Sequence, residues 1–162
     1  EIINQIKKMN THIDNVLISV GGGGLISGVG AILKQFLPNI NIIGIEPDEA
    51  KGITDSLKAD KPLEKVHINS IADSLCAPLH MPYSFSIAKQ VIDNMINISD
   101  NDMSKAMLFA FNNLKLFLEP ACVAGFAGLN KIKSFNSKDE NTLIILCGSN
   151  IDFQTWNSIV SN

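Results

Sequence analysis

Four consecutive glycines constrain this chain more than any other feature of its sequence; they are Gly21, Gly22, Gly23 and Gly24. The apolar, β-branched run at residues 15–20 precedes them and predicts a strand, and the apolar segment at residues 25–33 after them predicts a helix. Glycine loses more backbone entropy on folding than any other residue, so four in succession indicate close approach of the backbone to another group. The pattern therefore predicts a strand, a glycine loop and a helix.

A second apolar run at residues 40–45 completes a β-α-β unit, and it ends at Glu46 and Pro47 because proline disfavours continuation of a central strand. Near-continuous apolar strands indicate burial on both faces, as in a parallel sheet covered by helices. We expect further strands at residues 95–98 and 142–146, and helices at residues 2–9, 51–59, 84–92, 103–116, 121–132 and 152–160. A polar connection should occupy residues 134–141. The predicted fold class is α/β, with three αβα layers around a mostly parallel, twisted sheet.

Composition narrows the class of protein. The 162 residues are 46% hydrophobic and 18% charged, which fits one globular domain over residues 1–162. All 13 basic residues are lysines, set against 16 acidic residues, so we expect no nucleic-acid partner. No apolar run is long enough to cross a bilayer, so we expect no membrane partner. Three cysteines without a CxxC pair disfavour a disulfide framework and a zinc site, and favour a reducing, cytoplasmic setting.

The glycine loop is suited to an anion. Its backbone N–H groups and that of Leu25 would form a nest for a phosphate monoester at the start of the predicted helix. A tight turn without a ligand is the alternative. The dinucleotide fingerprint fails because Ile26 or Ser27 stands where its third glycine would be, and the GxxxxGK[ST] motif also fails. Glu46, 22 residues after Gly24, keeps a ribose-binding nucleotide site open as a further alternative.

Five ordered motifs resemble the fold-type II pyridoxal-phosphate enzymes, in particular threonine/serine dehydratases and serine racemases. The motifs are SVGGGGL (19–25), IEP (45–47), IAD (71–73), LEP (118–120) and LCGSNID (146–152). The resemblance covers nearly the whole chain and implies the C-terminal part of the cofactor-binding large domain, without the upstream strands and the small domain. It implies pyridoxal 5'-phosphate as cofactor and a small amino acid as substrate. A sheet edge left open by the missing half would favour a homo-oligomer.

The resemblance also implies roles for individual residues. The four glycines and Leu25 hold the cofactor phosphate, and Cys147 faces the pyridine nitrogen. A thiol, unlike an aspartate, does not keep that nitrogen protonated, which favours elimination over transamination. The alternative for Cys147 is a small buried hydrophobe at a strand end. The family places Glu119 near the cofactor, and the alternative is a helix-terminal acid bonded to backbone amides.

A divalent-cation site for Mg or Ca is a further implication of the resemblance. In the family, the acid at Glu46 ligates a cation together with the carbonyl at Ala50 and an acid two residues further on. Here the last position is Gly52, so a solvated acidic loop is the alternative. For His80, within a predicted loop, we expect a solvated side chain.

The Schiff-base lysine of the family lies in an upstream Ser-x-Lys-x-Arg-Gly segment, and this sequence contains no arginine. No catalytic residue is therefore assigned, and we expect the chain alone to be inactive. For the parent enzyme we expect β-elimination of L-threonine or L-serine to a 2-oxo acid and ammonia, with racemisation as a related possibility. The alternative from another class is a non-catalytic module that binds a phosphate or a nucleotide.

Overall fold

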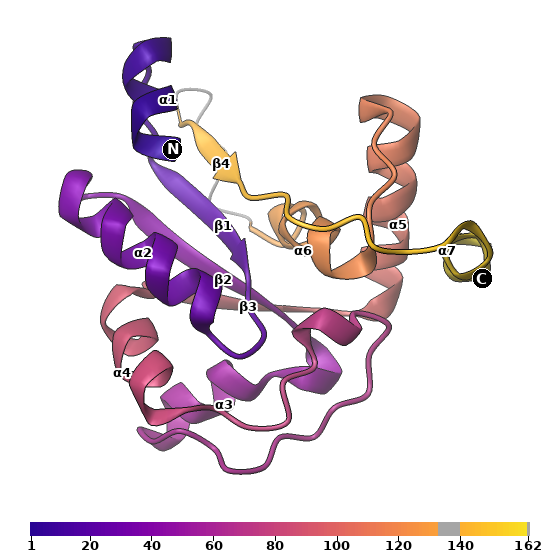
Figure 1. The fold of residues 1–162 in the computed structure, drawn as a ribbon, viewed down its shortest axis with the longest axis horizontal. Coiled ribbons are helices and arrows are strands. Elements are labelled where there is room, and N and C mark those ends of the chain that lie inside the picture. Colours follow the sequence, from indigo (N-terminus) through magenta and orange to yellow (C-terminus); the bar gives the residue numbers. More distant parts are fainter. Residues whose placement is uncertain (133–139, 162) are drawn as a thin grey trace.

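A four-stranded parallel sheet forms the centre of the protein in the computed structural model, which describes residues 1–132 and 140–161. The predicted connection at residues 134–141 lies mostly outside these residues. The strands are β1 (Asn15–Ser19), β2 (Asn41–Pro47), β3 (Asn94–Ile98) and β4 (Thr142–Ile144), in the order β3-β2-β1-β4 (Figure 1). Each neighbouring pair is parallel. The predicted α/β class with a parallel sheet is confirmed.

Helices cover both faces of this sheet (Figure 1). One face carries α1 (Ile2–Met9), α2 (Gly24–Phe36), α3 (Gly52–Ala59) and α4 (Pro82–Val91), and the other carries α5 (Asp100–Phe109), α6 (Pro120–Leu129) and α7 (Phe153–Val160). Successive side chains of a strand point to opposite faces. Val16 and Ile18 therefore enter the core beside α2 and α4, whereas Leu17 enters the core beside α5 and α6. The three αβα layers are confirmed.

The strand order places a crevice beside β1. From β1 the chain passes through α2 to β2 on one side, whereas β4 joins β1 on its other side after α5 and α6 have crossed the opposite face. The direction in which the chain adds strands to the sheet thus reverses between β1 and β4. In open parallel sheets, ligands bind outside the carboxyl ends of the strands at such a point.

The end of β2 differs from the prediction. The strand continues through Glu46 to Pro47, which lies opposite Ile98 of β3. The pairing of β2 with β1 ends at Ile45, so the missing N–H of Pro47 leaves no bond of the β1–β2 ladder unmade.

The long helix predicted at residues 103–116 also differs. It starts at Asp100, where a capping box joins Ser99 and Asp102, and after Phe109 it continues as a π-helical segment (Ala110–Leu114). Lys115, with φ of 59°, ends that segment.

Among the described residues, no helix has both the length and the apolar character that crossing a bilayer requires.

Candidate functional site

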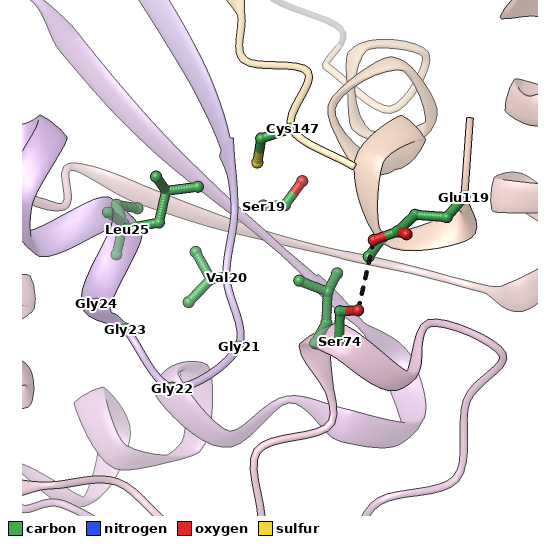
Figure 2. A pocket seen from close by; sticks show the side chains of 13 residues that line it. Ser19, Val20, Gly21, Gly22, Gly23, Gly24, Leu25, Ser74, Glu119 and Cys147 are labelled. Carbon is green, nitrogen blue, oxygen red and sulfur yellow. Dashed lines mark hydrogen bonds between the residues drawn. The ribbon is translucent and has the colours of Figure 1, made fainter. Parts of the chain in front are cut away.

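A cavity of about 290 Å³ lies at the carboxyl end of β1. Its walls come from the end of β1, the glycine loop, the start of α2, the short helix η2 (Asp73–Leu75), the start of α6 and the segment after β4 (Figure 2). It gathers every residue for which the sequence predicts a cofactor contact: Gly21, Gly22, Gly23, Gly24, Leu25, Glu119 and Cys147. The cavity therefore occupies the crevice that the strand order creates.

Two glycines of the loop are required by the fold itself. Gly23 has φ of 85°, a left-handed conformation that side chains rarely adopt, and it lies immediately before α2. At Gly21 a Cβ atom would lie 3.0 Å from the Cα atom of Leu75 and 3.0 Å from the carbonyl oxygen of Ser74. Both positions exclude larger residues whether or not a ligand binds.

The other two glycines have no such requirement. Among the residues that the structure describes, a Cβ atom at Gly24 would meet nothing within 4 Å, and one at Gly22 would touch the Cβ atom of Ala77 alone, at 3.8 Å. Both residues line the cavity, so glycine here leaves open a space next to the backbone. No side chain of the described residues caps the start of α2, which leaves its first N–H groups for an anion. This cradle fits a phosphate group.

Cys147 lies just after β4, and its exposed side chain lines the cavity. The exposure disagrees with the alternative of a buried hydrophobe. Cys122 in α6 is buried beneath it, and burial, together with the nearby Cys147, raises the pKa of the Cys122 thiol to about 11. The accessible thiol at the site is therefore that of Cys147.

Glu119 connects two walls of the cavity. One carboxylate oxygen accepts a hydrogen bond from the backbone N–H of Asn150 at 2.9 Å. The other accepts one from the hydroxyl of Ser74 at 3.4 Å, the bond drawn in Figure 2. Glu119 precedes α6 but makes no side-chain bond to the first turn of that helix, in contrast to the helix-terminal alternative. Gly148 makes room for it, since a Cβ atom there would lie 2.5 Å from the carboxylate.

Glu46 lies outside the cavity, fully buried at the end of β2. Its carboxylate accepts hydrogen bonds from the N–H groups of Ile53 and Thr54 at 2.7 and 2.9 Å, and from the Thr54 hydroxyl at 2.7 Å. Burial raises its pKa to about 7, although these hydrogen bonds act in the opposite direction. Glu46 thus holds the start of α3.

The predicted cation site gains no support from this arrangement. Ala50, the other predicted ligand, is buried. Within residues 1–132 and 140–161 there is no group of three or more His, Cys, Asp or Glu side chains placed to hold a metal ion. The ribose contact of Glu46 gains no support either, because α3 occupies its carboxylate. Both stay predictions from the sequence.

His80 is buried, and the expectation of a solvated loop histidine was wrong. Its side chain is 4% exposed, and its Nε2 atom lies 3.1 Å from the carbonyl oxygen of Gly21. The ring fills the space beside Gly52, where a Cβ atom would collide with it. This packing explains the glycine at position 52, and burial lowers the pKa of His80. Through its contact with Gly21, the His80 imidazole supports the glycine loop from outside the cavity.

Sequence reasoning missed Ser19 as a site residue. It is the last residue of β1, lines the cavity and is 5% exposed. Its hydroxyl finds no hydrogen-bond partner among the described residues. Its place at the end of the strand before the glycines was the available signal, but a missing partner is visible only in the folded protein.

Comparison with known proteins agrees with the fold and with the family resemblance. The family model "Pyridoxal-phosphate dependent enzyme" matches residues 1–148. The chain is 34% identical to a phenylserine dehydratase of Ralstonia pickettii over 144 residues, which are 89% of this chain and 44% of that protein.

Two solved structures have the same fold. The processed form of threonine deaminase isoform 2 from Solanum lycopersicum superposes with a TM-score of 0.86 at 30% identity, over 98% of this chain and 46% of that one. Maize serine racemase superposes with a TM-score of 0.83 at 28% identity, over 98% of this chain and 51% of that one. The chain thus spans about half the length of these proteins. It belongs to the family of pyridoxal-phosphate dependent enzymes.

Proposed function

We propose that this chain is the C-terminal part of the cofactor-binding domain of a pyridoxal-phosphate dependent dehydratase. The reaction of the whole enzyme is β-elimination of L-threonine, L-serine or a related hydroxy amino acid to a 2-oxo acid and ammonia. The observation that carries the proposal is the cavity in which the glycine loop, Cys147 and Glu119 meet. The dehydratase and deaminase names of its relatives support the class of reaction.

Each part of the cavity has a task in this proposal. The N–H groups at the start of α2 bind the phosphate, and the absence of side chains at Gly22 and Gly24 lets it approach the backbone. Bound pyridoxal phosphate supplies an electron sink for bond cleavage at the α-carbon of an amino acid. The Cys147 thiol would face the ring nitrogen of bound pyridoxal phosphate without holding it protonated, which would favour elimination. Glu119 positions the segment that carries Cys147, through its bond to Asn150.

The chain supplies binding groups rather than the reacting ones. None of its lysines stands in a Ser-x-Lys-x-Arg-Gly segment, since the sequence has no arginine. We therefore expect it to bind pyridoxal phosphate without turning over an amino acid, until the segment with the Schiff-base lysine is supplied. A homo-oligomer is also part of the proposal. The exposed apolar residues in and beside the π-helical segment support it: Phe109, Phe111, Leu114 and Leu116.

The test is the affinity of the chain for pyridoxal phosphate, measured by titration of the bound ligand's absorbance. Gly24→Ala should weaken binding by about tenfold or more, because its methyl group enters the space left for the phosphate. Gly28→Ala is the matched control, since Gly28 lies in α2, has open space at its Cβ position and does not line this cavity.

Equal affinities for the two variants and the unchanged chain would contradict the proposed site. Binding of inorganic phosphate as tight as that of pyridoxal phosphate would favour the non-catalytic phosphate-binding module instead. The latter outcome would mean that the ring contributes nothing to recognition.

A further inference from the structure

The hydroxyl of Ser19 is an unsatisfied polar group in the wall of the cavity. Ser19 is only 5% exposed, and its Oγ atom has no hydrogen-bond partner among the described residues. Most buried hydroxyls in folded proteins are hydrogen-bonded, because leaving one unpaired is unfavourable. An exception that lines a cavity indicates that the partner is a molecule inside it.

The backbone fixes where this hydroxyl points. Ser19 has the same parity along β1 as Leu17, which packs in the core beside α5 and α6. Its side chain therefore faces the α6 layer, and α2 lies on the opposite face of the sheet. Figure 2 shows the hydroxyl on the side of the cavity where Cys147 and Glu119 lie, away from the glycine loop. A ligand whose phosphate occupies the loop would present its other end to Ser19.

We propose that Ser19 is a further ligand-binding residue of this cavity, whose hydroxyl forms a hydrogen bond with a polar atom on the ring of the bound cofactor. The inference rests on the proposed function and extends it to Ser19, a residue to which the family resemblance assigns no role. A hydroxyl can both donate and accept a hydrogen bond, so it suits either a ring nitrogen or a ring hydroxyl. It carries no charge, so it adds none to the end of the cavity where the Glu119 carboxylate also lies.

If the Ser19 hydroxyl binds the ring, it contributes to the affinity for pyridoxal phosphate but not to the affinity for phosphate alone. By this proposal, inorganic phosphate in the glycine loop makes no contact with the Ser19 hydroxyl, whereas a phosphorylated ring does. Removing the hydroxyl should therefore lower the affinity for pyridoxal phosphate and leave the affinity for inorganic phosphate unchanged. The ratio of the two affinities measures the contribution of Ser19, and a general disturbance of the loop would lower both.

Stability gives an independent sign of the same role. In the free chain the Ser19 hydroxyl has no bond to any described residue to lose, so Ser19→Ala should leave the melting temperature unchanged or raise it. Ser27 is the matched control, because it is also 5% exposed but donates a hydrogen bond to the carbonyl oxygen of Ser84 at 2.8 Å. Ser27→Ala should lower the melting temperature and preserve the ratio of affinities.

The experiment measures the melting temperature and both affinities for the unchanged chain, Ser19→Ala and Ser27→Ala. We expect Ser19→Ala to weaken pyridoxal phosphate binding by about three- to tenfold, the effect of one neutral hydrogen bond, with no loss of melting temperature. An unchanged ratio of affinities, or a melting temperature that falls as it does in Ser27→Ala, would overturn the inference alone. Failure of the unchanged chain to bind pyridoxal phosphate would overturn the proposed function, and the inference with it.

Discussion

Replacing Glu46 by glutamine should remove a pH dependence that this buried carboxyl group imposes on folding. In the unfolded chain the group has its ordinary pKa of 4.5, and in the folded protein burial raises the pKa to about 7. Between these two pH values the folded protein holds a proton that the unfolded chain has released. The free energy of unfolding therefore falls as the pH rises through this range.

The size of the effect follows from the two pKa values. One unit of pKa shift corresponds to about 1.4 kcal/mol, so this carboxyl group contributes about 3 kcal/mol. The contribution is fully present below pH 4.5 and is lost once the pH has risen above about 7. It is a large fraction of the total stability of a domain of this size, typically about 5–15 kcal/mol.

Urea unfolding followed by circular dichroism, at several values from about pH 4 to about pH 8, measures this dependence. Glu46→Gln should give a profile flatter than that of the unchanged chain by about 3 kcal/mol over the range. The control is Glu64→Gln, which makes the same chemical change at an exposed position. Parallel profiles for Glu46→Gln and the unchanged chain would refute the argument that burial governs this group.

Three further changes test other parts of the structure. Gly23→Ala should lower the free energy of unfolding by about 1–2 kcal/mol, because alanine disfavours the left-handed φ of 85°; urea unfolding measures it, and a stability equal to that of the unchanged chain would contradict it. Ser99→Ala removes the capping box of α5 and should cost about 1 kcal/mol in the same assay, whereas no loss would mean that the cap is dispensable. Iodoacetamide should label the exposed Cys147 before the buried Cys122, and pyridoxal phosphate should slow that labelling; mass spectrometry of peptides shows the order, and faster labelling of Cys122 would be the opposite result.

Local sequence signals predicted the parts of the fold that depend on neighbours along the chain. The β-branched run before Gly21 and the apolar segment after Gly24 became β1 and α2, since strand and helix preferences act over a few residues. The place of β4 beside β1 was not predictable in this way. It depends on a pairing such as Leu17 with Ile144, which lie far apart in the sequence.

The site was predicted where a family motif carried the information, and was missed where packing decided. The motifs located Cys147 and Glu119, and the structure places both in one cavity with the glycine loop. Glu46 instead holds the start of α3, because Thr54 brings two hydrogen-bond donors to it. The burial of His80 depends on the open space at Gly52, which no pattern in the sequence indicates.

The amide chemical shifts of the ¹⁵N-labelled chain, recorded while pyridoxal phosphate is added, test the central claim most directly. If the glycine loop and the segment after β4 form a cofactor site, the largest changes should fall on the N–H groups of Gly22, Gly23, Gly24, Leu25 and Cys147. Inorganic phosphate should shift the loop signals and leave that of Cys147 nearly unchanged. Changes centred elsewhere, or no saturable change, would contradict the assignment of this cavity to pyridoxal phosphate.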